Sequence, residues 1–206
     1  MIYEVRTYTL RPGGIPEFER TFAEALPHRE KYSKLGAFWH TEFGPQNQVI
    51  HVWPYEDLAE RDRIRAEAAK DPHWPPKNDL DIYRSMQSEI FIPAQGSPPL
   101  GGDQALGNIY EMRIYTYKVG SMPEVIRRWE AAIPHRVPYS PIAAAWYSEL
   151  GKLNVWVHIW PYQSLEHRAE VRAKARENPN WPPPTGEFLV SEENKLLEPS
   201  AFSPMH

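Results

Sequence analysis

Hydrophobic and polar residues alternate at several places along the chain. Over residues 2–10, Tyr3 and Val5 fall on one face, whereas Glu4 and Arg6 fall on the other. A period of two residues is typical of a β-strand, because successive side chains point to opposite faces of a sheet. Further strands are predicted by the same reasoning at residues 37–42, 48–53 and 83–92.

Two helices are predicted between these strands. The first begins near Ile15, after a turn at Arg11-Pro12-Gly13-Gly14, and places Phe18 and Phe22 at helical spacing. We expect Pro27 to kink or split it, because proline cannot donate a backbone hydrogen bond. The second covers residues 57–70, which are rich in good helix formers. The resulting order, β-α-β-β-α-β, is that of a ferredoxin-like unit.

The whole arrangement occurs twice. Ile2-Tyr3-Glu4-Val5-Arg6 returns as Ile109-Tyr110-Glu111-Met112-Arg113, and His51-Val52-Trp53-Pro54-Tyr55 returns as His158-Ile159-Trp160-Pro161-Tyr162, in both cases 107 residues later. That period exceeds the roughly 20–50 residues of a solenoid repeat and fits a small domain. The sequence therefore predicts a first domain at 1–93, a linker at 94–107, and a second domain at 108–206.

Composition excludes several functional classes. The 206 residues carry a net charge of −4 and no basic run, which argues against nucleic acid as a partner. Cysteine is absent, so disulfides, thiol nucleophiles and thiolate metal sites are excluded. No signal peptide or membrane-spanning stretch is recognisable, and we expect a cytoplasmic protein without membrane insertion.

The repeated motifs resemble those of the NIPSNAP family. They are the opening Ile-Tyr-Glu-x-Arg-x-Tyr strand, the Pro-His helix, and the His-x-Trp-x-Tyr strand end, followed at the C-terminus by Lys195-Leu196-Leu197-Glu198-Pro199. The resemblance implies an α+β fold in which two ferredoxin-like units face each other across their sheets. Here both units belong to one chain, as an intramolecular dimeric α/β barrel. The resemblance does not imply a particular reaction.

The candidate site follows from assigning the faces of the strands. We expect the apolar face, with Ile50 and Val52, to pack on the helices, and the polar and aromatic face to line the barrel. His51 is a candidate general acid or base, Arg6 a candidate anion ligand, and Tyr8 and Trp53 candidate stacking groups. The residues assigned to catalysis are Glu4, Arg6, Tyr8, His51, Glu111, Arg113, Tyr115 and His158. The residues assigned to ligand binding are His28, Trp39, Trp53, Tyr55, His135, Trp146, Trp160 and Tyr162.

Structural interpretations stay open beside these. Glu4 and Arg6 form an ion pair that fixes the pairing of the halves, or they bind a ligand. His51 satisfies a neighbouring carbonyl, or it serves in the site. The function predicted is therefore binding, with or without transformation, of a small molecule in a polar-aromatic barrel cavity. The alternative is a non-catalytic adaptor module, and the sequence does not decide whether the protein is an enzyme.

The sequence gives little support for a cofactor or for further partners. No metal-ligand spacing or nucleotide-binding motif occurs, so no cofactor is predicted; if a metal or haem were held, His28 or His51 would be the first candidates. The fused pair is a candidate for further homo-oligomer formation. Because His40 and Val49 stand where the second half has Tyr147 and Trp156, we expect a roomier cavity in the first half.

Overall fold

The computed structural model describes all 206 residues as two consecutive β-α-β-β-α-β units. The first contains β1 (Ile2–Leu10), α1 (Ile15–Arg29), β2 (Ala37–Phe43), β3 (Gln48–Tyr55), α2 (Leu58–Ala68) and β4 (Tyr83–Pro93). The second contains β5 (Ile109–Tyr117), α3 (Met122–Arg136), β6 (Ala144–Leu150), β7 (Val155–Tyr162), α4 (Leu165–Arg176) and β8 (Leu189–Pro199). Both units have the predicted order of elements.

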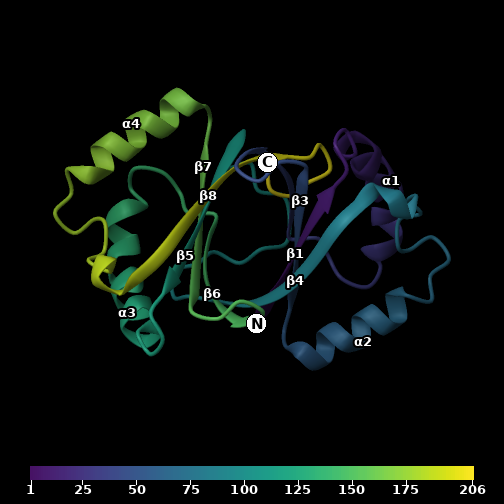
Figure 1. The fold of residues 1–206 in the computed structure, drawn as a ribbon, viewed down its shortest axis with the longest axis horizontal. Coiled ribbons are helices and arrows are strands. Elements are labelled where there is room, and N and C mark those ends of the chain that lie inside the picture. The colour runs from purple at the N-terminus through teal and green to yellow at the C-terminus, as the bar shows by residue number, and fades with distance from the viewer.

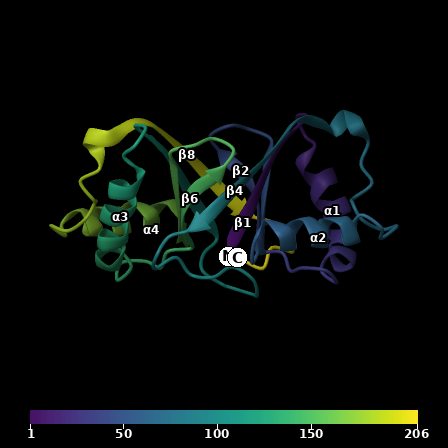
Figure 2. The same cartoon turned by 90° about the horizontal axis from the view of Figure 1, so that it is seen from below.

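The eight strands close into one barrel in the order β1-β3-β2-β8-β5-β7-β6-β4. Each unit contributes four neighbouring strands, and the seams are the antiparallel pairs β2–β8 and β4–β6. The helices lie outside, α1 and α2 on one flank and α3 and α4 on the opposite flank (Figures 1 and 2). The predicted α+β barrel built from two ferredoxin-like units is confirmed.

The barrel lumen is the apolar face of the strands, which corrects the predicted assignment. One hydrophobic cluster draws on both units and contains Tyr3, Val5, Ile50 and Val52. The opposite face, with Tyr8 and the other polar and aromatic positions, packs against the helices of its own unit. The prediction that these groups line the barrel is wrong for Glu4, Arg6, Tyr8, Val49, His51, Trp53, Glu111, Arg113, Tyr115, Trp156, His158 and Trp160. It holds for Trp39 and Trp146, which lie in the lumen cluster.

The reversal has a physical reason. The lumen is walled by strands of both units, so a polar group there would lose water without gaining a partner. The helix layer is different, because α2 brings Arg61 and Arg65 down onto the sheet, where they bond the carboxylate of Glu4. A buried charge is tolerated where such partners exist.

Helix α1 is not split at Pro27. It continues to Arg29, and α3 likewise passes Pro134 and ends at Arg136. The last turn places the guanidinium groups of Arg29 and Arg136 under the sheet, where both are buried. None of the four helices combines the length and apolar character needed to span a membrane.

Gly107 sits where the chain between the units passes close to β7. A Cβ atom added there would lie 2.7 Å from the backbone oxygen of Tyr162 and 2.8 Å from its nitrogen. We expect Gly107→Ala to lower the free energy of unfolding by about 1–3 kcal/mol, because backbone must move to relieve the contact. Urea unfolding checks this. Gly186→Ala, where nothing lies within 4 Å, is the control and should cause little change.

Candidate ligand-binding sites

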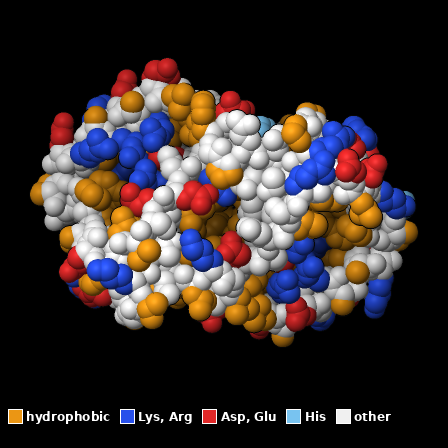
Figure 3. All heavy atoms as spheres, in the orientation of Figure 1, with side chains coloured by type: hydrophobic (Ala, Val, Ile, Leu, Met, Phe, Trp, Pro, Cys, Tyr) orange, Lys and Arg blue, Asp and Glu red, His pale blue; other side chains and the backbone are white.

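Each unit contains a pocket between its sheet and its two helices. The pocket of the first unit has a volume of about 460 Å³ and that of the second about 350 Å³. In Figure 3, hydrophobic side chains gather between the helices of each unit and are bordered by basic ones. Sites of this size and mixed lining are typical of small-molecule pockets.

The register of β1 and β3 assembles the sheet side of the first pocket. Arg6 lies opposite His51 in the antiparallel pair, and Tyr8 lies two residues along the same face. Helix α1 adds Phe22 and Arg29. The loop at Trp74-Pro75-Pro76 closes the outer side, since the ring of Trp74 packs edge-on to that of Trp53, 6.1 Å between centroids.

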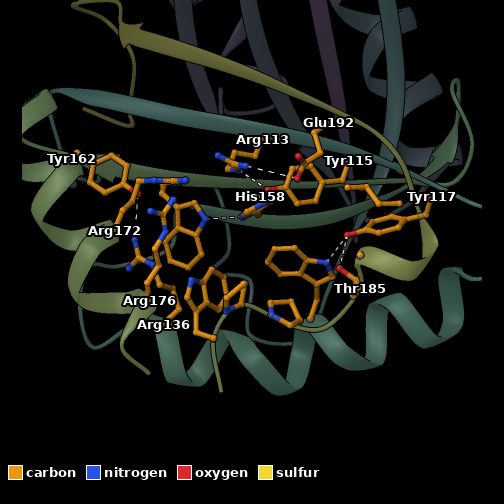
Figure 4. Close-up of a pocket in the computed structure, with 17 residues that line it drawn as sticks. Arg113, Tyr115, Tyr117, Arg136, His158, Tyr162, Arg172, Arg176, Thr185 and Glu192 are labelled. Atoms are coloured by element: carbon orange, nitrogen blue, oxygen red, sulfur yellow. Dashed lines mark hydrogen bonds and ion pairs between the residues drawn. The ribbon is translucent and has the colours of Figure 1, made fainter. Parts of the chain in front are cut away.

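The second pocket repeats this plan. Figure 4 shows Arg113, Tyr115 and His158 coming from the sheet, while Arg136, Arg172 and Arg176 gather at one side of the same space. The predicted residues are thus brought together in each unit, although outside the lumen. Those lining the two pockets are Arg6, Tyr8, His51, Trp53, Tyr55, Arg113, Tyr115, His158, Trp160 and Tyr162.

Glu4 lies behind the first pocket and forms ion pairs with several arginines. Its side chain is fully buried, and Oε1 accepts hydrogen bonds from Arg6 (2.8 Å), Arg61 (2.8 Å) and Ser88 (2.7 Å). Burial alone would raise the pKa of Glu4, but the hydrogen bonds from Arg61 and Ser88 and the charges of Arg65 and Arg6 lower it to about 2. Glu4 is therefore a fixed anion. Its bonds stay within one unit, so the idea that the Glu4–Arg6 pair fixes the pairing of the halves is not supported.

Arg29 is a buried cation without a carboxylate partner. It is 3% exposed, and its guanidinium donates to the hydroxyls of Tyr55 (2.9 Å) and Ser33 (2.8 Å). The same guanidinium lies 4.4 Å from the ring centroid of Trp53, a cation–π contact. Burial lowers the pKa of Arg29. Its counterpart Arg136, 2% exposed, donates to Tyr162 and Ser140 in the same way.

His51 is held neutral in the pocket wall. Its Nδ1 accepts a hydrogen bond from the indole nitrogen of Trp53 at 2.7 Å, and its buried Nε2 has no partner. Burial, reinforced by the charge of Arg6, lowers the pKa of His51 to about 3. Because Nδ1 is the acceptor, the neutral ring carries its proton on Nε2. His51, the candidate general acid or base, therefore does not titrate near neutrality, and the same burial lowers the pKa of His158.

The two pockets differ in detail. Position 129 is tryptophan where the first unit has Phe22, and its indole donates to Tyr117. Arg176 and Glu192 replace Ala69 and Met86 at the corresponding positions of the lining. The first pocket is the larger, but the predicted difference concerned a cavity in the barrel. The residues on which that expectation rested, His40 and Val49, do not line it.

Some predicted ligand residues lie elsewhere. The ring of His28 stacks on that of His73 at the surface, with 4.3 Å between the ring centroids, and His135 is exposed. Neither histidine lines the pocket of its unit. Sequence reasoning missed the neighbours that do, Arg29 and Arg136. The sequence does contain a signal for these two arginines, because each directly follows the histidine of a Pro-His pair that occurs in both halves. The missed arginines of the pocket walls also include Arg65, Arg172 and Arg176.

Known sequences similar to this chain include members of the NIPSNAP family. The model of the family described as NIPSNAP matches residues 3–98 and 110–204. The human protein NipSnap homolog 3B is 31% identical over 216 residues, covering 98% of this chain and 85% of its own length. Protein NipSnap of Drosophila melanogaster is 28% identical, covering 99% and 78%.

Comparison with solved structures concerns the fold alone. A Fusobacterium nucleatum protein provisionally described as a monooxygenase aligns with a TM-score of 0.64, covering 96% of this chain and 91% of its own at 11% identity. An anthrone oxidase-like protein aligns with a TM-score of 0.56 at 10% identity, covering 98% and 93%. A shared fold at such low identity does not carry a function with it.

Proposed function

The chain belongs to the NIPSNAP family, and from that premise we propose that each unit binds a small organic anion with an aromatic or apolar body. The ligand occupies the pocket between the sheet and the two helices. The observation that carries the proposal is the buried guanidinium of Arg29, and its counterpart Arg136, lining a pocket without any carboxylate partner. A charge that is buried and unpaired is unfavourable, and an anionic ligand would remove that penalty.

Neighbouring groups extend the same argument. Arg6 and Arg65 also line the first pocket, and the one buried carboxylate near them, Glu4, is already shared among several donors. A guanidinium binds a carboxylate or phosphate through paired hydrogen bonds. The aromatic rings of Phe22, Trp53 and Trp74 would contact the rest of the ligand.

The titration properties favour binding over acid–base catalysis. A general acid or base works best when its pKa lies near the working pH. Burial lowers the pKa of His51 to about 3 and raises the pKa of Tyr115 to about 12. We therefore propose that His51 and His158 act as neutral donors, each offering its unpaired Nε2 proton to an acceptor atom of the ligand.

Titration calorimetry with 2-naphthoate tests this function. The wild-type protein should bind two equivalents, one in each unit. Arg29→Gln should leave one equivalent, and the double variant Arg29→Gln, Arg136→Gln should leave none, because each substitution removes the unpaired cation of one pocket. The uncharged 2-naphthamide should bind more weakly, by roughly tenfold or more, because it cannot compensate a buried charge.

The control uses exposed arginines of the same helices. Arg20→Gln on α1 and Arg127→Gln on α3 remove the same charge at the surface and should keep two equivalents. Circular dichroism should show that all variants remain folded. Equal affinity for naphthoate and naphthamide, or an unchanged stoichiometry in the double variant, would contradict the proposal.

A further inference from the structure

A third cavity lies inside the barrel, between the two units. It has a volume of about 440 Å³ and is lined by residues of both halves, including Val5, Phe91, Met112 and Val157. Figure 3 shows a hollow in the middle of the molecule with hydrophobic side chains inside and acidic and basic ones at its rim. This cavity shares no lining residue with the two pockets already described.

Trp146 supplies a buried polar group beside the apolar side chains of this cavity, which Thr7, Gln87 and Ser88 also line. The side chain lines the cavity and is fully buried, and its indole Nε1 has no hydrogen-bond partner. An unpaired buried N–H is rare in proteins, because it loses its bond to water on folding. A ligand atom that accepts a hydrogen bond would satisfy it.

Charges at the mouth of the cavity balance. Lys152 and Lys195 line it together with Glu89 and Glu193. Lys195 is already engaged, since its ammonium group lies 3.0 Å from the Gln48 side-chain oxygen and 3.4 Å from the Glu193 carboxylate. The two lysines and two glutamates leave the mouth without net charge, in contrast to the arginine-lined pockets of the units.

From these features we infer that the barrel lumen is a separate binding site for an uncharged, mainly apolar molecule that carries a carbonyl oxygen. The aliphatic part lies among the lumen side chains, and the carbonyl accepts the hydrogen bond of the Trp146 indole. The site is formed only when both units pack together. It does not depend on the function proposed for the pockets of the units, and its ligand belongs to a different chemical class.

Nuclear magnetic resonance on ¹⁵N-labelled protein tests the inference with 2-octanone as the probe. The indole N–H resonance of Trp146 is identified by its absence in Trp146→Phe. It should move downfield on addition of the ketone, because a new hydrogen bond forms. Trp39, the counterpart of Trp146 in the first unit, also has an unpaired indole but does not line the cavity, so its resonance should stay in place.

Variants and a charged comparator complete the experiment. Trp146→Phe should weaken 2-octanone binding about five- to tenfold, the effect of one hydrogen bond, whereas Trp39→Phe should not change it. Val5→Phe should abolish binding by filling the cavity. A Trp146 resonance in the wild-type protein that is unmoved by the ketone would overturn the inference. It would also be overturned if octanoate moved that resonance equally, or if Val5→Phe, while still folded, bound normally.

Discussion

Acidification from pH 7.5 to 5.0 is expected to lower the free energy of unfolding by about 2 kcal/mol through His51 alone. The pKa of this buried ring is about 3 in the folded protein, against an ordinary value of 6.5. Below pH 6.5, His51 is therefore protonated in the unfolded chain but stays neutral in the folded protein. The free energy of unfolding consequently falls as the pH falls. His158 acts in the same direction. The range stays above pH 5, so titration of Glu4, whose pKa is about 2, contributes little.

Urea unfolding at several pH values measures this slope. His51→Gln should make it shallower, because the substitution removes the titrating group. His40 provides a control of opposite sign. Its hydrogen bond to Glu19 raises the pKa of His40, so it contributes stability below pH 6.5 that is lost as the pH rises through the folded pKa. His40→Gln should therefore make the protein more sensitive to acid. A slope unaffected by His51→Gln would show that the ring titrates normally.

Replacing Glu4 by glutamine is expected to reduce the free energy of unfolding by about 3–5 kcal/mol, the usual effect of removing one partner from a buried ion pair. The carboxylate is fully buried and neutralises Arg6, Arg61 and Arg65. An amide keeps the size of the side chain but leaves Arg6 and Arg65 without an anion, and Arg61 with Asp62 as its remaining partner. Chemical denaturation at pH 7.5 gives the value directly.

Glu24→Gln is the matched control for this substitution. Glu24 also pairs with an arginine, Arg20, but both side chains are more than 60% exposed, and such surface pairs contribute little. Glu111→Gln should behave like Glu4→Gln, because Arg113, Arg168 and Arg172 surround it in the same way. If Glu4→Gln cost no more than Glu24→Gln, the buried network would not stabilise the fold.

The fold could be predicted because its signals are local and occur twice. Alternation over residues 2–10 and helical spacing from Ile15 each depend only on nearby residues, and the copy 107 residues later confirms the reading. The boundaries of β1, β3 and β4 lie within two residues of those predicted. Barrel closure could be anticipated only through the resemblance, since no local pattern specifies that β2 pairs with β8.

The side of the sheet on which the site lies could not be predicted. Period-two alternation separates Glu4, Arg6 and His51 from Val5 and Val52, but it does not state which set faces the helices. That choice depends on Arg61 and Arg65, which come from another element and bond the carboxylate of Glu4. The burial of Arg29 could not be predicted either. It depends on helix α1 continuing past Pro27, where the sequence predicts a kink or a break.

The seams β2–β8 and β4–β6 join the two halves within one covalent chain. Assembly of the barrel is therefore a unimolecular step, and dilution does not oppose it as it would for two separate subunits. A substitution in this chain also changes only one of the two units, whereas in a homodimer it would change both subunits. The sequence of one pocket can consequently change while that of the other is retained. The exchange of Ala69 and Met86 for Arg176 and Glu192 is a divergence of this kind.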